Sequence, residues 1–197
     1  GQGRVFLGRG PSCADIEAVT GCAAMEPIRV YAGMPEEGQS LQSTADLVVE
    51  ELHRTGAFDR AVILIATSTG SGWVDEWQVQ PLEYLTRGNC ATASMQYSFV
   101  PSSINFLTDL DVSEEAAVIL FETIRRAVDE IPEDRRPALF VCGESLGAYA
   151  SQHVFSGIVD VLSRTDGALW VGTPAFTPMH AELTAIRHRG SPEVAPV

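Results

Sequence analysis

The sequence predicts an α/β protein with a central, mainly parallel sheet and helices on both faces. Short apolar runs alternate along the chain with longer segments whose apolar residues recur at helical spacing. One run, Ala61–Ala66, is continuous and rich in β-branched residues, which is typical of a strand buried on both faces. The segments between runs are long enough for helices, as right-handed crossovers between parallel strands require.

The expected strands follow from these apolar runs in chain order. Residues 1–27 come first and are rich in Gly, Pro and small side chains, so we expect an irregular arm there. Strands are then expected at Ile28–Ala32, Ala61–Ala66, Ala91–Tyr97, Ala138–Cys142 and Ala168–Gly172. Together the arm and the alternating elements form one domain over residues 1–197, which we expect to be an incomplete portion of a larger catalytic domain.

Helical periodicity fills the segments between the strands. The first helix has apolar residues from Leu41 to Leu52 and stops at Gly56. A second is expected over 75–86, and a third begins after Ser113, which suits an N-cap, and ends at Pro132. The last two are expected at Ser145–Leu162 and, more weakly patterned, at Met179–Arg187.

Composition excludes several chemistries. The net charge is −13, the wrong sign for tracking phosphates, so nucleic acid is not an expected partner. All 13 basic residues are Arg, which excludes a Schiff-base lysine, a phosphate-loop lysine and a serine–lysine dyad within the chain. No apolar run approaches the roughly 18 residues of a membrane span. No signal-peptide pattern is found at the N-terminus. The first residue is Gly1 rather than Met, so we expect flanking segments to be missing.

The four cysteines do not form a zinc signature. Cys142 ends an apolar strand and is expected to pack as a small buried side chain. Cys13 and Cys22 pair across a short loop only if the compartment is oxidising, and the sequence leaves that open.

The segment Gly143-Glu144-Ser145-Leu146-Gly147 is the strongest functional signal. A Gly-x-Ser-x-Gly sequence also occurs by chance as a helix N-cap, but this one lies between a predicted strand and a predicted helix. Chemistry in parallel sheets gathers at the carboxyl ends of the strands. The position therefore favours Ser145 as a nucleophile on a tight turn, with the helix N-terminus beneath it.

A second loop of small residues, Thr67–Trp73, follows an earlier strand. In serine hydrolases of this topology one oxyanion donor is the N–H after the nucleophile, here Leu146, and the other comes from such a loop. We expect Thr69 to be the second donor, with Ser68 or Gly70 as neighbours that also fit. A phosphate cradle and a plain surface turn are the alternatives.

These segments resemble the actinobacterial α/β-hydrolase family whose members often carry membrane helices before the catalytic domain. The similarity runs from about residue 4 and is carried by 26–31 (EPIRVY), 54–60 (RTGAFDR), 69–75 (TGSGWVD), 96–98 (QYS), 140–147 (FVCGESLG) and 166–172 (DGALWVG). The resemblance implies an α/β-hydrolase-like fold and a serine esterase, lipase-like enzyme or acyltransferase with Ser145 as nucleophile. It also implies an acyl ester or lipid substrate, and membrane attachment or a cell-envelope location through flanking segments.

The resemblance breaks at the C-terminal end. The strands of the family that carry the catalytic acid and histidine come after the serine, and they do not fit within the residues that follow strand 168–172. We expect a histidine and an acid from a segment beyond residue 197, in the same polypeptide or as a separate chain.

Residues within the chain offer weaker substitutes for that pair. His180 is the one histidine that follows the last strand and is a possible base; the other three are expected at the surface or in packing (His53, His153 and His188). Among the acids, Asp75 is expected to cap a helix, and Asp166 lies before a strand, at the wrong edge of the sheet. Trp73 and Tyr97 line either an acyl pocket or the core.

The sequence thus favours a serine hydrolase that needs no metal or organic cofactor. The alternative is a non-catalytic interaction module on a truncated hydrolase fold, with Ser145 idle.

Overall fold

The computed structural model describes residues 2–98 and 110–191. Its strands are β1 (Ile28–Ala32), β2 (Val62–Thr67), β3 (Cys90–Met95), β4 (Ala138–Glu144) and β5 (Gly167–Val171). Its α-helices are α1 (Gln2–Gly8), α2 (Cys13–Thr20), α3 (Leu41–Arg54), α4 (Glu76–Leu85), α6 (Leu110–Asp129), α7 (Leu146–His153), α8 (Ile158–Arg164) and α9 (Pro178–Ala185). Short 3₁₀ turns lie at η1 (Ala57–Asp59) and η2 (Glu133–Arg135).

The five strands form one parallel sheet in the order β1-β3-β2-β4-β5. The predicted parallel architecture is therefore confirmed, and each expected strand lies within about two residues of its observed bounds. Strand β2 pairs with β4 from Val62 opposite Ala138 to Thr67 opposite Gly143. This register places the loop after β2 beside the Gly-x-Ser-x-Gly segment, which begins at the end of β4.

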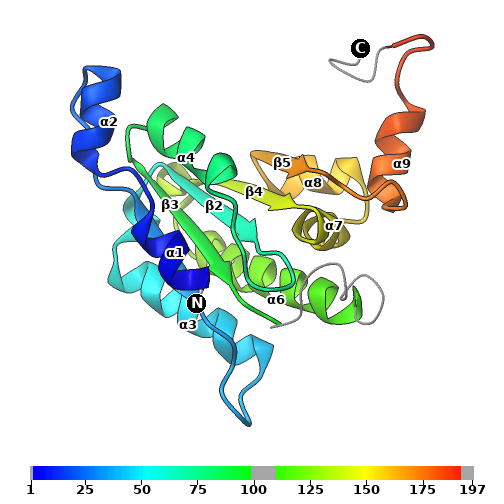
Figure 1. Cartoon of the computed structure of the whole chain (residues 1–197), viewed down its shortest axis with the longest axis horizontal. Coiled ribbons are helices and arrows are strands. Elements are labelled where there is room, and N and C mark those ends of the chain that lie inside the picture. The colour runs from blue at the N-terminus through cyan, green and yellow to red at the C-terminus, as the bar shows by residue number, and fades with distance from the viewer. Residues whose placement is uncertain (1, 99–109, 192–197) are drawn as a thin grey trace.

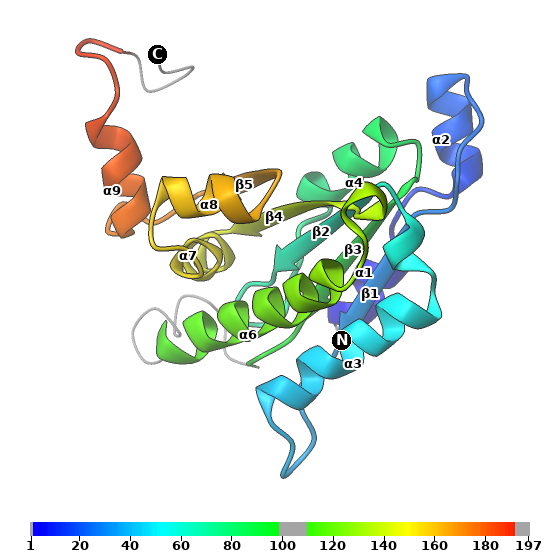
Figure 2. The ribbon, with the colours of Figure 1, turned by 180° about the vertical axis from the view of Figure 1, so that it is seen from behind.

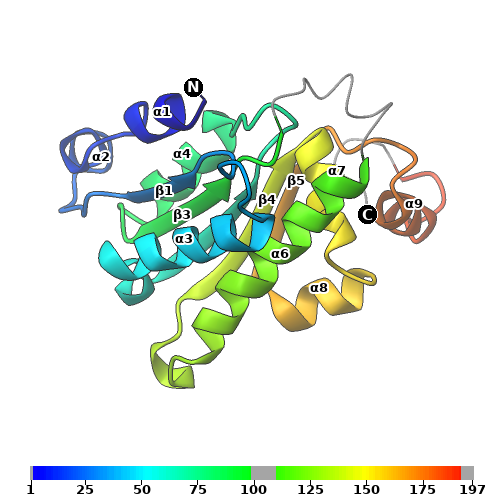
Figure 3. The ribbon, with the colours of Figure 1, turned by 90° about the horizontal axis from the view of Figure 1, so that it is seen from below.

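Helices cover both faces of the sheet, as Figure 3 shows. On one face, α3 and α6 pack over the larger apolar cluster, which includes Val48, Phe121 and Ile63. On the other face, α1 and α4 enclose a smaller cluster around Phe6, Leu64 and Cys142. Along α6, Phe121 and Ile124 are fully buried against the sheet.

The N-terminal arm is not irregular, contrary to the prediction. It contains α1 and α2, and α2 begins with a capping box in which Ser12 and Asp15 satisfy each other's backbone N–H groups. The side chains of Phe6 and Ile16 are buried, so the arm packs onto the domain. Figures 1 and 2 show α2 and α9 at opposite ends of the molecule.

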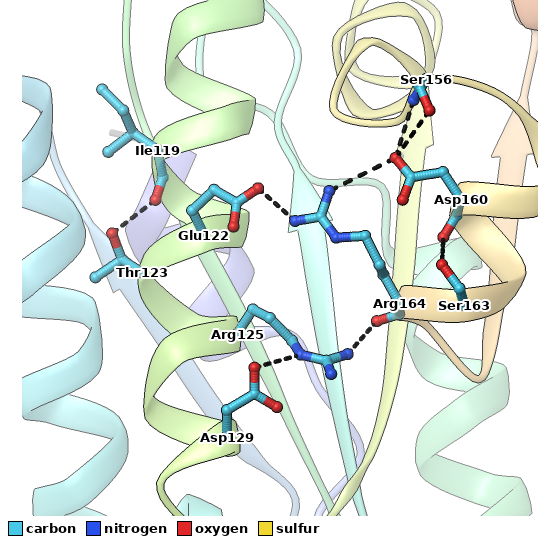
Figure 4. A network of polar contacts seen from close by, with 9 residues as sticks. All are labelled: Ile119, Glu122, Thr123, Arg125, Asp129, Ser156, Asp160, Ser163 and Arg164. Atoms are coloured by element: carbon cyan, nitrogen blue, oxygen red, sulfur yellow. Dashed lines mark hydrogen bonds and ion pairs between the residues drawn. The ribbon is translucent and has the colours of Figure 1, made fainter.

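The single helix expected from Ser145 to Leu162 is also wrong, because the chain breaks after α7 and restarts at α8. Asp160 accepts a hydrogen bond from the Ser156 N–H at 3.0 Å, which satisfies a donor just before the new helix. Arg164 then ties α8 to α6: its guanidinium contacts Glu122, and its carbonyl accepts a hydrogen bond from Arg125 at 2.6 Å (Figure 4). The same guanidinium stacks on Phe121 and Phe155.

Three smaller expectations concern the cap at Ser113, the cysteines and membrane-spanning helices. Ser113 is not an N-cap, because α6 begins at Leu110 and the Ser113 hydroxyl donates to the Leu110 carbonyl at 2.7 Å. All four cysteines are free thiols, and Cys142 is buried as expected. Within residues 2–98 and 110–191, no helix combines the length and apolar character needed to cross a membrane.

Candidate active site

Ser145 occupies a sharp turn between β4 and α7. Its backbone angles are φ 52° and ψ −114°, a conformation that residues other than glycine rarely adopt. Such a conformation costs on the order of 1–3 kcal/mol and persists only where the surroundings enforce it. Here the Ser145 N–H donates to the Val171 carbonyl of β5 at 2.9 Å, and its carbonyl accepts from the Tyr149 N–H at 3.0 Å. Its hydroxyl makes no capping hydrogen bond to α7.

The two flanking glycines are required by close backbone contacts. A Cβ on Gly143 would lie 2.4 Å from the carbonyl oxygen of Gly147. A Cβ on Gly147 would lie 2.3 Å from the carbonyl oxygen of Thr67 and 3.2 Å from that of Ser68. Both glycines therefore permit a close approach of backbone atoms, and the start of α7 touches the loop that follows β2.

Side chains from α4 and its N-cap surround the end of β4. Gln78 is buried and its Nε2 donates to the Gly143 carbonyl at 3.1 Å, which fixes the strand just before the turn. Asp75 accepts a hydrogen bond from the Trp77 N–H at 3.1 Å, so it caps α4 as predicted. Burial, and secondly the charge of Asp75, raise the pKa of Glu144, the residue before Ser145.

The predicted oxyanion donors lie beside the turn, but they differ in availability. Leu146 is the first residue of α7, so its N–H has no acceptor within the helix. Thr69 lies in the adjacent loop, but its N–H donates to the Trp73 carbonyl at 2.9 Å. The Gly72 N–H in turn donates to the Thr69 carbonyl at 2.8 Å, which closes the loop on itself. The role of Thr69 stays a prediction, and it requires the bond to Trp73 to be exchanged for a bond to substrate.

No hydrogen bond joins a histidine to Ser145 in the described part of the chain. His153 pairs with Glu114 through its Nε2 at 3.1 Å, which agrees with a packing role. His180 is on α9, where its carbonyl accepts from Thr184; no polar contact links its ring to the Ser145 turn in residues 2–98 and 110–191. The other two are exposed, as expected (His53 and His188).

Three further predictions concern Asp166 and the aromatic residues Tyr97 and Trp73. Asp166 accepts a hydrogen bond from the Leu139 N–H at 2.7 Å, at the amino edge of the sheet and away from Ser145. Tyr97 is buried in the main core cluster, where its hydroxyl donates to the Ser68 carbonyl at 3.3 Å. Trp73 is half-buried at the end of the same loop.

The sequence interpretation missed three side chains that hold the site together. Gln78, Tyr31 and Gln96 each donate to a backbone carbonyl next to Ser145 or in the neighbouring loop. Their partners lie 65, 41 and 25 residues away along the chain, so no local pattern reveals them.

Comparison with known protein families supports the fold assignment. A model described as the alpha/beta-hydrolase family matches residues 28–197, a range that contains all five strands, the Ser145 turn and the neighbouring loop. Comparison with curated proteins and with solved structures gave no match. Since the family model covers most of the sequence and the parallel sheet agrees with it, the chain belongs to the alpha/beta-hydrolase family.

Proposed function

We propose that the chain is a serine ester hydrolase or acyltransferase with Ser145 as its nucleophile. The observation that carries this proposal is the strained turn at the carboxyl end of β4, where an uncapped hydroxyl sits between two glycines that nothing larger can replace. Strain of this kind is maintained by the rest of the fold, and in serine hydrolases of this topology such a turn presents the hydroxyl at the edge of the sheet.

The chemistry follows the usual two steps of acyl transfer. The Ser145 oxygen forms a bond to the ester carbonyl carbon while its proton passes to a base, and the carbonyl electron pair moves onto oxygen. Collapse of this intermediate breaks the bond to the alcohol, which leaves with a proton. Water or a second alcohol then takes the acyl group from Ser145.

Two backbone donors are proposed to stabilise the oxyanion. The Leu146 N–H lies at the N-terminus of α7, where the helix dipole favours negative charge. The Thr69 N–H is the proposed second donor after it releases Trp73. Loss of one such donor costs on the order of 10²–10³ in kcat.

The base and acid are proposed to come from a segment outside residues 1–197. His153 is already paired with Glu114, and His180, the alternative base, would have to reach Ser145 from α9. In the described sheet β5 pairs on one side only, and its Leu169 and Val171 side chains are 51% and 43% exposed. An apolar groove of about 320 Å³ lies between β5 and α4. The unpaired edge of β5 is where a further strand, from another segment, would extend the sheet.

The substrate is proposed to be an acyl ester, and a lipid ester of the cell envelope is the narrower candidate. Attachment to a membrane through flanking segments belongs to the same proposal. It rests on the family resemblance of the segments around Ser145.

Burst kinetics with a nitrophenyl acyl ester test the proposal. The encoded full-length polypeptide should release one equivalent of nitrophenol per Ser145 before steady turnover, and Ser145→Ala should abolish the burst. A burst from residues 1–197 alone would assign the base to His180, and His180→Gln should then remove it. Absence of a burst in both preparations would favour the non-catalytic interaction module.

A further inference from the structure

The loop beside Ser145, residues 68–73, is held from outside by side chains of two other strands. The Tyr31 hydroxyl, from β1, donates to the Gly72 carbonyl at 2.7 Å. Gln96, just after β3, donates to the Ser71 carbonyl at 3.2 Å, and Tyr97 donates to that of Ser68 at 3.3 Å. Three of the loop's carbonyl groups therefore point towards side chains on β1 or just after β3.

A held carbonyl also fixes the N–H of the same peptide group. The peptide unit is planar and trans, so its N–H points opposite to its carbonyl. The Gly72 carbonyl shares its peptide group with the Trp73 N–H, and the Trp73 carbonyl accepts the Thr69 N–H. Tyr31 thus fixes the peptide group between Gly72 and Trp73, and Trp73 holds the Thr69 N–H, the proposed oxyanion donor.

Tyr31 is itself packed against the N-terminal arm. A Cβ on Gly3 of α1 would lie 2.4 Å from the Tyr31 ring, and the Phe6 ring centroid is 6.0 Å from that of Tyr31. Arg29 holds α1 in place by donating to the Phe6 carbonyl at 2.6 Å. The arm lies outside the range that the family model matches, 28–197.

The Tyr31 hydroxyl lies close against Gly72. Gly72 has φ 82°, and a Cβ there would lie 2.4 Å from the Tyr31 hydroxyl oxygen and 2.8 Å from Gln96. Burial raises the pKa of Tyr31 above its usual value, so the phenol stays a hydrogen-bond donor throughout an ordinary assay range.

We infer that Tyr31 is a positioning residue for the oxyanion loop, and that α1 sets its place. The arm presses the Tyr31 ring into position, the Tyr31 hydroxyl holds Gly72, and Gly72 and Trp73 keep the Thr69 N–H in the closed loop from which substrate must release it. The inference rests on the proposed function for its effect on catalysis, but the loop contact is testable without any activity.

The test is Tyr31→Phe in the full-length polypeptide, which removes one hydroxyl and keeps the ring. Tyr84→Phe on α4 is the matched control, because it makes the same chemical change away from the loop. For ester hydrolysis, Tyr31→Phe should raise kcat several-fold with KM unchanged, because a looser Trp73 carbonyl competes less strongly with the transition state for the Thr69 N–H. Amide exchange at Thr69 and Gly72 should accelerate about five- to tenfold, as expected for loss of one hydrogen bond.

Gly3→Ala tests the contribution of the arm. It should raise kcat in the wild-type background and have no further effect in Tyr31→Phe, because both changes act through the same hydroxyl. Additive effects on kcat would contradict the part assigned to α1.

The outcomes separate the inference from the proposed function. If the wild-type protein shows no ester burst, the proposed function fails, and amide exchange in the loop alone decides whether Tyr31 positions it. Unchanged exchange at Thr69 and Gly72 in Tyr31→Phe would overturn the inference. Equal values of kcat in Tyr31→Phe and Tyr84→Phe would also overturn it.

Discussion

At the scale of the residue, the backbone of Ser145 is in a conformation that costs a serine free energy. Glycine adopts φ 52° and ψ −114° without strain, yet the position holds serine. The turn is closed by bonds to Val171 and Tyr149 that do not depend on the side chain. Removing the side chain should therefore relieve the strain and leave the turn in place.

Ser145→Gly should raise the free energy of unfolding by about 1 kcal/mol relative to Ser145→Ala, since alanine keeps the strained backbone. Both variants should lose ester hydrolysis. Chemical denaturation of the two variants side by side measures the difference. A less stable Ser145→Gly would show that the turn carries no strain.

Sequence reasoning found Ser145, Leu146 and the two glycines because they lie within one short segment. It missed Tyr31 and Gln78, whose hydrogen bonds reach across strands to backbone carbonyls. A donor to a distant carbonyl leaves no periodic signal, so only the assembled sheet reveals it. The engagement of the Thr69 N–H by Trp73 was hidden for the same reason.

At the scale of the element, the contact between α7 and the loop after β2 sets the geometry of the site. Gly147 is the contact point, and its neighbours are backbone atoms that have little freedom to yield. Any side chain at this position would push α7 away from β2.

Gly147→Ala should lower the free energy of unfolding by about 3 kcal/mol, because its Cβ would overlap the Thr67 carbonyl. It should also lower kcat for ester hydrolysis as Leu146 moves away from the loop. Gly33→Ala is the control, since a Cβ there meets nothing within 4 Å. Equal stability of the two variants by thermal denaturation would argue against the close contact.

The strands were predicted well. The helices within residues 1–27 and the helix that follows Ser145 were predicted less well. Apolar runs such as Ala61–Ala66 identify buried parallel strands directly. The helix expected over 145–162 was wrong because its apolar pattern continues across the break near Ser156, whose N–H donates to the Asp160 side chain instead of to a helical carbonyl. The prediction of an irregular arm was wrong because its small residues give no helical pattern. The two short helices there are supported by the tertiary packing of Phe6 and Ile16.

At the scale of the whole molecule, a buried ion pair joins the arm to the sheet and α4. Arg29 on β1 makes two hydrogen bonds of 2.6 Å to the Glu83 carboxylate, and the side chains are 6% and 0% exposed. The third contact, to the Phe6 carbonyl, brings in α1. The pair is thus the point where three parts of the fold meet.

Arg29→Met should lower the free energy of unfolding by about 3–5 kcal/mol, because it leaves Glu83 charged and buried. Adding Glu83→Leu should restore most of the loss. Arg54→Met, which breaks an exposed pair with Glu51, should have no measurable effect on urea denaturation. A double variant as unstable as Arg29→Met would show that the pair contributes through its hydrogen bonds to α1.

Peptide mapping of the full-length polypeptide after treatment with a fluorophosphonate tests the central claim most directly. This reagent reacts with serines that are activated for acyl transfer, so we predict one adduct, on the peptide that contains Ser145, and none in Ser145→Ala. An unmodified Ser145 peptide, or an adduct that persists in Ser145→Ala, would contradict the account.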